Sequence, residues 1–229
     1  MNILLVNPVI PETFWSFKHA LKFVSKRASF PPLGLLTVAA LLPPDWNKKL
    51  IDMNVQELPD EDILRADYVF LSGMSIQETS VRQVMARCKQ LGRPIVAGGP
   101  LFTARAKEFD AIDHLVLNEA EITLPIFLRD LQNGGAKHLY TTRDWADVTT
   151  TPPPLWSQMN QRYYASMNVQ YSRGCPYDCE FCDITVLYGV CLEQKARPNS
   201  SPSSMGCTKP AGKATSSWWT TISSATKEN

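Results

Sequence analysis

The chain has 229 residues, of which 44% are hydrophobic and 20% charged, and its formal net charge is +1. This composition excludes a collagen-like or wholly disordered chain. The balanced charge gives no support to a protein that binds nucleic acid or a membrane surface. No apolar run approaches the roughly 20 residues of a transmembrane helix, and the N-terminal residues do not form a signal peptide. We therefore expect a cytoplasmic protein with no transmembrane segment.

Short apolar runs alternate with helical patterns along the first part of the chain. In chain order, the patterns predict a strand at 3–6, an aromatic-rich loop to residue 30, a helix at 31–42, a strand at 50–53, a helix at 60–65, a strand at 68–72, a helix at 79–91, strands at 94–97 and 114–117, and a helix at 123–133. Thr79 is the expected cap of its helix, and Thr123 is the expected start of the last one. Five strands alternating with helices predict an α/β fold with a doubly wound, Rossmann- or flavodoxin-like parallel sheet.

The carboxyl ends of these strands are the expected ligand edge of the sheet. Ligands of doubly wound sheets bind beyond the carboxyl ends of the strands, and glycine lets the backbone approach a ligand closely. No G-x-G-x-x-G or Walker A pattern is present, which disfavours a dinucleotide or a nucleoside triphosphate. The glycines either cradle another ligand or only make tight turns. The residues at these ends include Ser72, Gly73, Met74, Gly98, Gly99, Pro100, Asn118 and Glu119.

We expect four parts along the chain. We expect a sheet domain at 1–145, a linker at 146–165 that contains the extended run TTTPPP, a short second unit at 166–189, and an aberrant tail at 190–229. In the tail, 13 of 40 residues are Ser or Thr and Asp is absent. Such a composition predicts disorder rather than a packed core.

The six cysteines fall into three groups. Cys88 lies on the apolar face of a predicted helix and is expected in the core, and two cysteines lie in the tail. Cys175, Cys179 and Cys182 form a C-x3-C-x2-C run, which favours a metal centre over a disulfide in a cytoplasmic protein. A structural zinc needs a fourth ligand, for which Cys191 is the nearest candidate. Three thiolates on a 4Fe-4S cluster would leave one iron open, and we favour the cluster over zinc.

The run CPYDCEFC resembles the cluster-binding signature of the radical S-adenosylmethionine (radical SAM) enzymes. The sheet domain before it resembles the cobalamin-binding domain that many of these enzymes carry. The strings FPPLGLLTVAALLP, VAGGPLF, LNEAEITLP and SRGCPYDCEFCDIT are similar to the subfamily that includes the hopanoid C-methylases. The resemblance covers residues 1–189, and it implies that 166–189 begin an incomplete radical SAM (β/α) barrel.

The resemblance implies binding roles for several residues and assigns none of them to catalysis. The three cysteines would hold the 4Fe-4S cluster, and Phe181 would contact the adenine of S-adenosylmethionine. Glu121 would stand with Glu119 in a Gly-Glu-Gly-Glu-like loop that is only partly kept here. Cobalt would lack a histidine ligand from the protein, because no histidine lies in a D-x-H-x-x-G loop. The tail of cobalamin would be lined by Ser72, Met74, Gly98, Gly99, Pro100 and Glu119.

The activity that the resemblance implies is cobalamin-dependent C-methylation of an unactivated carbon. S-adenosylmethionine would supply the radical and cobalamin the methyl group. A flavodoxin or ferredoxin would donate the electron, and the substrate would be a small or lipid-like molecule. Two alternatives remain open: a cobalamin-binding module without catalysis, and a zinc-stabilised interaction protein.

The tail departs from the sequence that the resemblance predicts there. Tryptophan has a single codon, so Trp218, Trp219 and Thr220 force a valine and an aspartate when the bases are read one position earlier. Permitted codons then turn SWWTTISSATKEN into FVVDDNFIGNKRK, which resembles the family's second barrel strand. We therefore expect a shift of reading frame after Gly189, and a truncated, inactive form of the enzyme.

Overall fold

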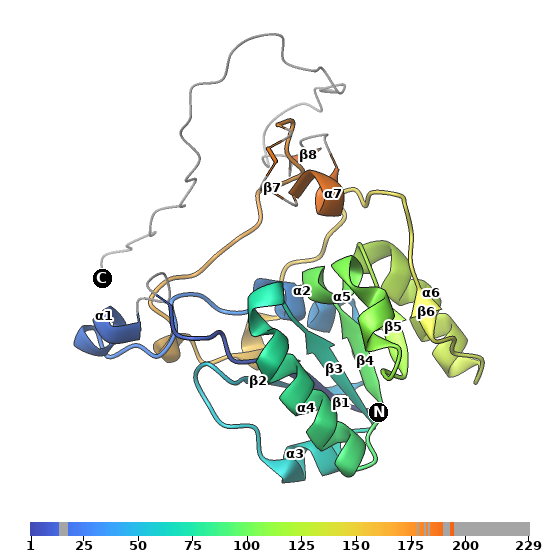
Figure 1. Cartoon of the computed structure of the whole chain (residues 1–229), viewed down its shortest axis with the longest axis horizontal. Helices are drawn as coiled ribbons and strands as arrows, with labels where there is room; N and C mark the ends of the chain where they lie inside the picture. Colours follow the sequence, from blue (N-terminus) through green and yellow to red (C-terminus); the bar gives the residue numbers. More distant parts are fainter. Residues whose placement is uncertain (14–17, 178, 181, 183, 190–192, 195–229) are drawn as a thin grey trace.

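A parallel sheet, of six strands in the described part of the chain, forms the centre of the computed structural model (Figure 1). The structure describes residues 1–13, 18–177, 179–180, 182, 184–189 and 193–194. The strand order is β2-β1-β3-β4-β5-β6, and every neighbouring pair is parallel, which confirms the predicted α/β fold. The strands are β1 (Asn2–Asn7), β2 (Asn47–Asp52), β3 (Tyr68–Ser72), β4 (Ile95–Gly98), β5 (His114–Val116) and β6 (Leu139–Tyr140).

Two strands differ from the sequence prediction. β2 begins three residues earlier than expected, because Asn47 and the two lysines after it pair with β1 despite being polar. β6 was not predicted, since two residues are too few to show an alternating pattern. It joins the sheet because Leu139 and Tyr140 pair with the last two residues of β5.

The helices are short and lie between the strands in sequence. None of them, within the described ranges, has the length and apolar character needed to cross a bilayer. The α-helices are α1 (Lys18–Phe23), α2 (Leu33–Leu41), α3 (Asp60–Arg65), α4 (Glu78–Gln90), α5 (Pro100–Ala104), α6 (Ala120–Gln132) and α7 (Ile184–Tyr188). The 3₁₀ turns are η2 (Ser75–Gln77), η3 (Ala106–Phe109), η4 (Trp156–Gln158) and η5 (Gln161–Tyr163).

The predicted helix starts at Thr79 and Thr123 are wrong. α4 begins one residue before Thr79 and continues directly from η2, so no side chain caps it. Thr123 lies inside α6, where its hydroxyl donates to the backbone oxygens of Leu117 and Glu119, each at 3.1 Å. A threonine that bonds to a carbonyl four residues earlier fits a helix interior as well as a cap. The short helices α1 and α5 were not predicted.

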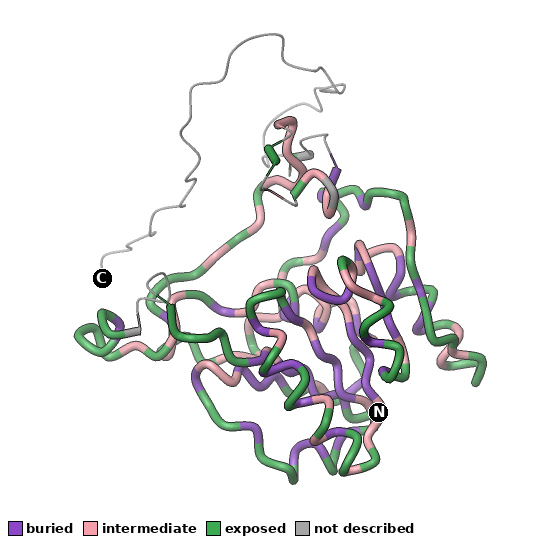
Figure 2. The backbone as a smooth tube through the Cα atoms, viewed as in Figure 1, coloured by how far each residue is buried: buried purple, intermediate pink, exposed green. Residues whose placement is uncertain are grey.

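Helices cover both faces of the sheet, and buried residues follow its strands (Figure 2). α3, α4 and α5 pack on one face, where Phe102 and Phe109 are fully buried. α2 and α6 pack on the other face, around Phe127. Leu4 belongs to the first core and Leu5 to the second, because successive side chains of a strand point to opposite faces. Burial on both faces explains why β1 reads as a continuous apolar run.

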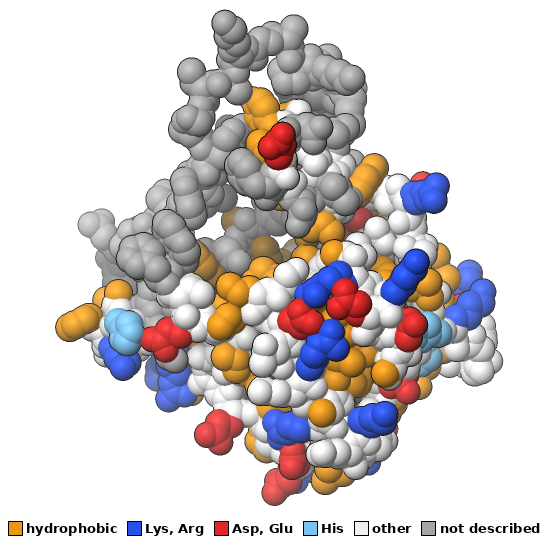
Figure 3. Space-filling model, viewed as in Figure 1, with side chains coloured by type: hydrophobic (Ala, Val, Ile, Leu, Met, Phe, Trp, Pro, Cys, Tyr) orange, Lys and Arg blue, Asp and Glu red, His pale blue; other side chains and the backbone are white. Residues whose placement is uncertain are grey.

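Charged side chains pair with one another on the outer surface over α4 and α5, where both signs gather in Figure 3. Glu78 lies 2.8 Å from Arg82 and 2.5 Å from Arg105. At the β2 edge of the sheet, Lys49 makes a 2.7 Å ion pair with Asp62. The Glu78 pairs are at the surface, where ion pairs contribute little to stability individually, whereas the Asp62 side chain is buried.

The segment expected to be a linker packs against the sheet domain. Three residues of this segment are buried: Val148, Thr151 and Tyr164. The Tyr164 hydroxyl donates to Asp52 at 2.9 Å, at the carboxyl end of β2. Backbone hydrogen bonds also join residues 163–166 to 27–29, including one from the amide of Ala165 to the oxygen of Ala28. The chain is thus held against the domain at both ends of this stretch.

The cysteine segment, residues 166–189, lies over the carboxyl ends of the strands, above α2 and α5 in the view of Figure 1. Its strand β7 (Ser172–Arg173) pairs antiparallel with β8 (Glu193–Gln194). The amide of Cys175 donates to the oxygen of Gly189 at 3.1 Å. Residues 193–194 are the part of the expected tail that the structure describes, and the rest of that prediction lies outside the described residues.

Candidate functional site

A cavity of about 300 Å³ lies at the carboxyl ends of the central strands β3, β4 and β5. Its floor includes Phe70, Val96 and Val116, which face the core under α2 and α6. The N-terminal turns of α2 and α6 form two of its sides. A doubly wound sheet binds ligands in such a crevice. The predicted ligand residues that line it are Ser72, Gly98, Gly99, Pro100 and Glu119.

Met74 is the predicted ligand residue that lies outside this cavity lining. Its side chain is 46% exposed. Here the amide of Met74 donates to the side-chain oxygen of Gln77 at 2.9 Å, so the chain passes directly from β3 into η2. Position at a strand end was therefore a correct guide to the edge of the sheet but not to the cavity wall.

Two glycines allow the strand ends to approach one another closely. A Cβ atom at Gly98 would lie 2.5 Å from the backbone oxygen of Val116 in the neighbouring strand. Gly99 has φ of +95°, and a Cβ atom there would lie 2.7 Å from the hydroxyl of Ser72. A larger residue at either position would push β4 away from its neighbours and change the cavity wall.

Three charged residues from distant parts of the chain meet at one side of the cavity. Arg173 of β7 donates through Nη1 to Glu119 at 2.5 Å and through Nη2 to Glu121 at 2.6 Å. The side chains of Glu119, Arg173 and Glu121 are 1%, 10% and 12% exposed. The two carboxylates have second donors, the amide of Ala146 for Glu119 and the hydroxyl of Thr151 for Glu121.

Burial and the arginine act on the two carboxyl groups in opposite directions. Burial raises the pKa of Glu119, against the lowering effect of Ala146 and Arg173. Burial is the largest single effect on Glu121 and acts to raise its pKa, but Arg173, a backbone amide and the Thr151 hydroxyl together outweigh it, so this pKa falls below its usual value. The pKa of Arg173 is raised despite burial, because both carboxylates stabilise its charge. The cluster therefore holds one positive charge against two acidic groups in a largely dry setting.

The family comparison identifies this domain. Residues 24–128 match the family described as the B12 binding domain. The sheet domain belongs to the B12-binding domain family. The match runs from the end of α1 through β2, β3, β4 and β5 into α6, so it includes every strand end that contributes to the cavity.

Several curated relatives of this chain are methyltransferases or methylases by name. It is 41% identical over 191 residues to an uncharacterized methyltransferase of Synechocystis sp., and 34% identical over 193 residues to the hopanoid C-2 methylase of Rhodopseudomonas palustris. Each alignment covers 82% of this chain, and the chain spans 36% and 37% of the length of these two relatives. A bacteriochlorophyllide d C-8(2)-methyltransferase of Chlorobaculum tepidum is 26% identical over 160 residues, or 66% of this chain and 34% of the relative.

The cavity of the B12-binding domain has the character of a site for a mostly apolar ligand with a few polar groups. Its walls are largely aliphatic, and two buried polar atoms of lining residues, Glu119 Oε1 and Arg173 Nε, have no hydrogen-bond partner among the described residues. A buried polar atom without a partner is costly. A ligand with amide, hydroxyl and phosphate groups beside an aromatic base fits this combination, and cobalamin is such a ligand.

The three cysteines of the predicted metal centre come shortly after Arg173, a lining residue of the cavity, in the sequence. Cys175 and Cys182 are partly buried and Cys179 is exposed. Among the described residues, no three cysteine, histidine or acidic side chains are close enough together to hold a metal ion. The thiolates have the right chemistry for a cluster, but the structure does not gather them around one point. Phe181 lies outside the described residues.

The described histidines lie away from the cavity of the B12-binding domain. His114 is at the start of β5, the opposite end of that strand, where its Nδ1 is 2.7 Å from the oxygen of Lys137. His138 lies just before β6, and His19 pairs with Glu12 near α1. None of them is a lining residue of the cavity.

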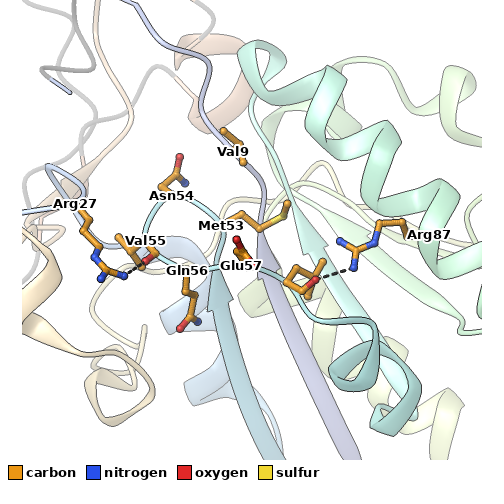
Figure 4. A pocket seen from close by; sticks show the side chains of 9 residues that line it. Val9, Arg27, Met53, Asn54, Val55, Gln56, Glu57 and Arg87 are labelled. Carbon is orange, nitrogen blue, oxygen red and sulfur yellow. Dashed lines mark hydrogen bonds between the residues drawn. The ribbon is translucent and has the colours of Figure 1, made fainter. Parts of the chain in front are cut away.

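A second hollow, of about 610 Å³, lies between Val9 and the loop after β2 (Figure 4). Its two arginines face the loop backbone: Arg27 donates to the oxygen of Val55, and Arg87 donates to the oxygen of Leu58, each at 2.7 Å. Their guanidinium groups therefore hold the loop in place. We assign no ligand to this hollow.

Sequence reasoning missed Arg173 as a site residue, although it lies two residues before the first cysteine of the motif. Gln170 and Tyr188, also from the cysteine segment, line the cavity as well. The useful signal was the position of an arginine beside the metal motif and of two glutamates at a strand end. A charged side chain is costly to bury alone, so a buried arginine and buried glutamates are expected to pair with each other.

Proposed function

We propose that this chain binds cobalamin in the cavity of its B12-binding domain and carries part of a cobalamin-dependent radical SAM C-methyltransferase. The observation that carries the proposal is the cavity itself. It lies at the carboxyl edge of a B12-binding sheet, and it contains a buried glutamate oxygen that has no hydrogen-bond partner in the part of the chain that the structure describes. The relatives named as methyltransferases support the reaction class.

The residues of this chain would act mainly by binding and by excluding water. Gly98 and Gly99 would let the ligand approach the backbone, and Ser72 and Glu119 would bond to its polar groups. Phe70 and Val96 would cover its aromatic base. Bound cobalamin would supply a transferable methyl group, and a 4Fe-4S cluster with S-adenosylmethionine would supply a radical that activates the substrate carbon.

The Gly34→Phe variant tests this assignment of the cavity. Gly34 lines the cavity from α2, and a Cβ atom there meets no atom within 4 Å. The new ring is expected to occupy the cavity without straining the fold, and to weaken cobalamin binding at least about tenfold. Equilibrium dialysis of the full chain against hydroxocobalamin measures the affinity, and thermal unfolding checks the fold.

Met74→Phe is the matched control, because Met74 was also a predicted ligand residue but lies outside the cavity. Its affinity for cobalamin should equal that of the wild type. Equal loss of affinity in both variants, or a wild-type chain that does not bind cobalamin, would contradict the proposed site.

The three cysteines are proposed to bind a 4Fe-4S cluster rather than zinc. The support is the C-x3-C-x2-C spacing and three thiolates with no disulfide among the described residues. Anaerobic reconstitution with iron and sulfide should give the broad visible absorbance of a cluster. Replacement of Cys175, Cys179 and Cys182 by alanine should abolish that absorbance, whereas Cys88→Ala should not change it. Tight zinc binding without cluster formation would favour the interaction-protein alternative.

The substrate is proposed to be a polycyclic, lipid-like molecule, and the electron donor a flavodoxin or ferredoxin. Two relatives are named for a hopanoid and a bacteriochlorophyllide, both large ring systems. The composition of residues 190–229 supports the frameshift, and this predicts little deoxyadenosine formation by this chain. A chain that retains cobalamin without turnover would match the binding-module alternative.

A further inference from the structure

One wall of the cavity comes from the cysteine segment rather than from the B12-binding sheet. Gln170, Arg173 and Tyr188 line it, opposite strand ends that precede them by more than fifty residues in sequence. These three residues lie on either side of the cysteine motif. The cavity is therefore complete only when the cysteine segment is seated on the sheet domain.

Arg173 is the main polar contact that seats this wall. Both of its carboxylate partners are also held by the linker that packs on the sheet domain, Glu119 by the amide of Ala146 and Glu121 by the hydroxyl of Thr151. The carboxylates thus form a prepared receptor, and Arg173 spans the two with separate nitrogens of one guanidinium group. Gln170 also accepts a hydrogen bond from Arg173 at 3.0 Å, which orients the arginine from its own segment.

The cysteine loop is tied closely to this arginine. Cys175 follows Arg173 by two residues, and the amide of Cys175 donates to the oxygen of Gly189, the residue after Tyr188. The loop therefore begins and ends next to cavity-lining side chains. A displacement of Arg173 would move the start of the loop with it, because two residues leave little slack in the backbone.

We propose that Arg173 is a positioning residue that makes the cysteine loop a wall of the cobalamin cavity, so that filling the cavity and ordering the loop favour each other. This rests on the proposed function, because it takes cobalamin as the ligand. Coupling of this kind is reciprocal: a ligand that binds better to the seated wall must stabilise the seated wall. The loop that is proposed to carry the cluster would then be ordered when the methyl-carrying cofactor is present.

Arg173 binds the two carboxylates with two nitrogens of one planar guanidinium group, and a lysine cannot reproduce this fork-shaped arrangement. A lysine ammonium is a single point charge and cannot hold two carboxylates with separate nitrogens in a fixed geometry. Arg173→Lys keeps the charge and loses the fork, whereas Arg173→Met loses both. Arg129→Met is the matched control, since Arg129 is an exposed arginine on α6.

Alkylation of individual cysteines in the full chain tests the proposal. Samples treated with N-ethylmaleimide are quenched over time and analysed by peptide mass spectrometry. Without cobalamin, Arg173→Met is expected to increase the alkylation rate of Cys175 about tenfold, with Arg173→Lys between it and the wild type. Alkylation requires access of the reagent to the sulfur, so acceleration reports exposure.

Cys88 serves as the internal standard for unfolding. It is fully buried in the core under α4, and burial raises the pKa of its thiol to about 11. Its alkylation should stay equally slow in the wild type and in all three variants. Faster alkylation of Cys88 in a variant identifies global unfolding. If Arg173→Met unfolds, the Arg173→Lys variant is the deciding test. Faster alkylation of Cys175 with Cys88 still protected would support the proposal.

A second measurement compares alkylation of Cys175 in the presence of cobalamin and of cobinamide, which lacks the nucleotide tail. Cobalamin is expected to slow alkylation of Cys175 at least about threefold in the wild type and not in Arg173→Met, while cobinamide has no effect. Cobalamin binding without protection of Cys175 would overturn the coupling and leave the proposed function standing. Unchanged Cys175 reactivity in both Arg173 variants would overturn the positioning role, and absence of cobalamin binding would overturn the proposed function and the coupling together.

Discussion

The Gly98→Val variant is expected to lose cobalamin binding and to be destabilised by about 3 kcal/mol. The first atom of the new side chain would lie 2.5 Å from the backbone oxygen of Val116. That oxygen belongs to the paired strand β5 and cannot rotate away as a flexible side chain would. The strands must separate at their carboxyl ends, where the cavity lies. Urea denaturation measures the stability, and equilibrium dialysis measures cobalamin binding.

Gly135→Val makes the same substitution where there is room. The nearest atom to a Cβ at Gly135 is the backbone oxygen of Asp130, at 4.0 Å. We expect its free energy of unfolding to change by less than about 1 kcal/mol and cobalamin affinity to be retained. If Gly98→Val were as stable as this control and still bound cobalamin, the close packing of β4 against β5 would be refuted.

Asp52→Ala is expected to destabilise the chain by about 3 kcal/mol and to release the segment around Tyr164. Asp52 is 2% exposed and accepts hydrogen bonds from the Asn7 side chain, from both the amide and the side chain of Asn54, and from the Tyr164 hydroxyl. Its removal leaves these donors without their acceptor. Burial and the charge of Asp52 raise the pKa of Tyr164, so this hydroxyl remains a donor at neutral pH.

Urea denaturation and limited chymotrypsin digestion measure the two effects of Asp52→Ala. Faster cleavage near Tyr163 and Tyr164 should accompany the loss of stability, since this segment is bonded to residues 27–29 and to Asp52. Asp144→Ala, at an exposed aspartate, should change the unfolding free energy by less than about 0.5 kcal/mol. Equal effects of the two substitutions would show that Asp52 does not anchor this segment.

The central elements could be predicted because each shows its pattern locally. β1 and β3 are apolar runs that end in polar residues or glycine, and α3 was predicted at its observed bounds, Asp60–Arg65. β6 could not be predicted, because its two residues become a strand only by pairing with β5. The packing of the linker on the sheet domain could not be predicted either. It depends on the hydrogen bond from Tyr164 to Asp52, which joins residues 112 positions apart in the sequence.

The candidate site was predictable on one side only. The rule for strand ends placed Ser72, Gly98 and Glu119 at the correct edge of the sheet. It could not separate them from Met74, which follows β3 equally closely but is turned outward by η2. The opposite wall, with Arg173, depends on a contact across 54 residues that no periodicity encodes.

The two edges of the sheet have a consequence for how this chain meets other proteins. β2, one edge strand, presents Lys48 and Lys49, and β6, the other, has only two residues. Lysines and short length both discourage a further strand from adding to a sheet. Side-by-side strand exchange and fibre-like stacking are thus disfavoured.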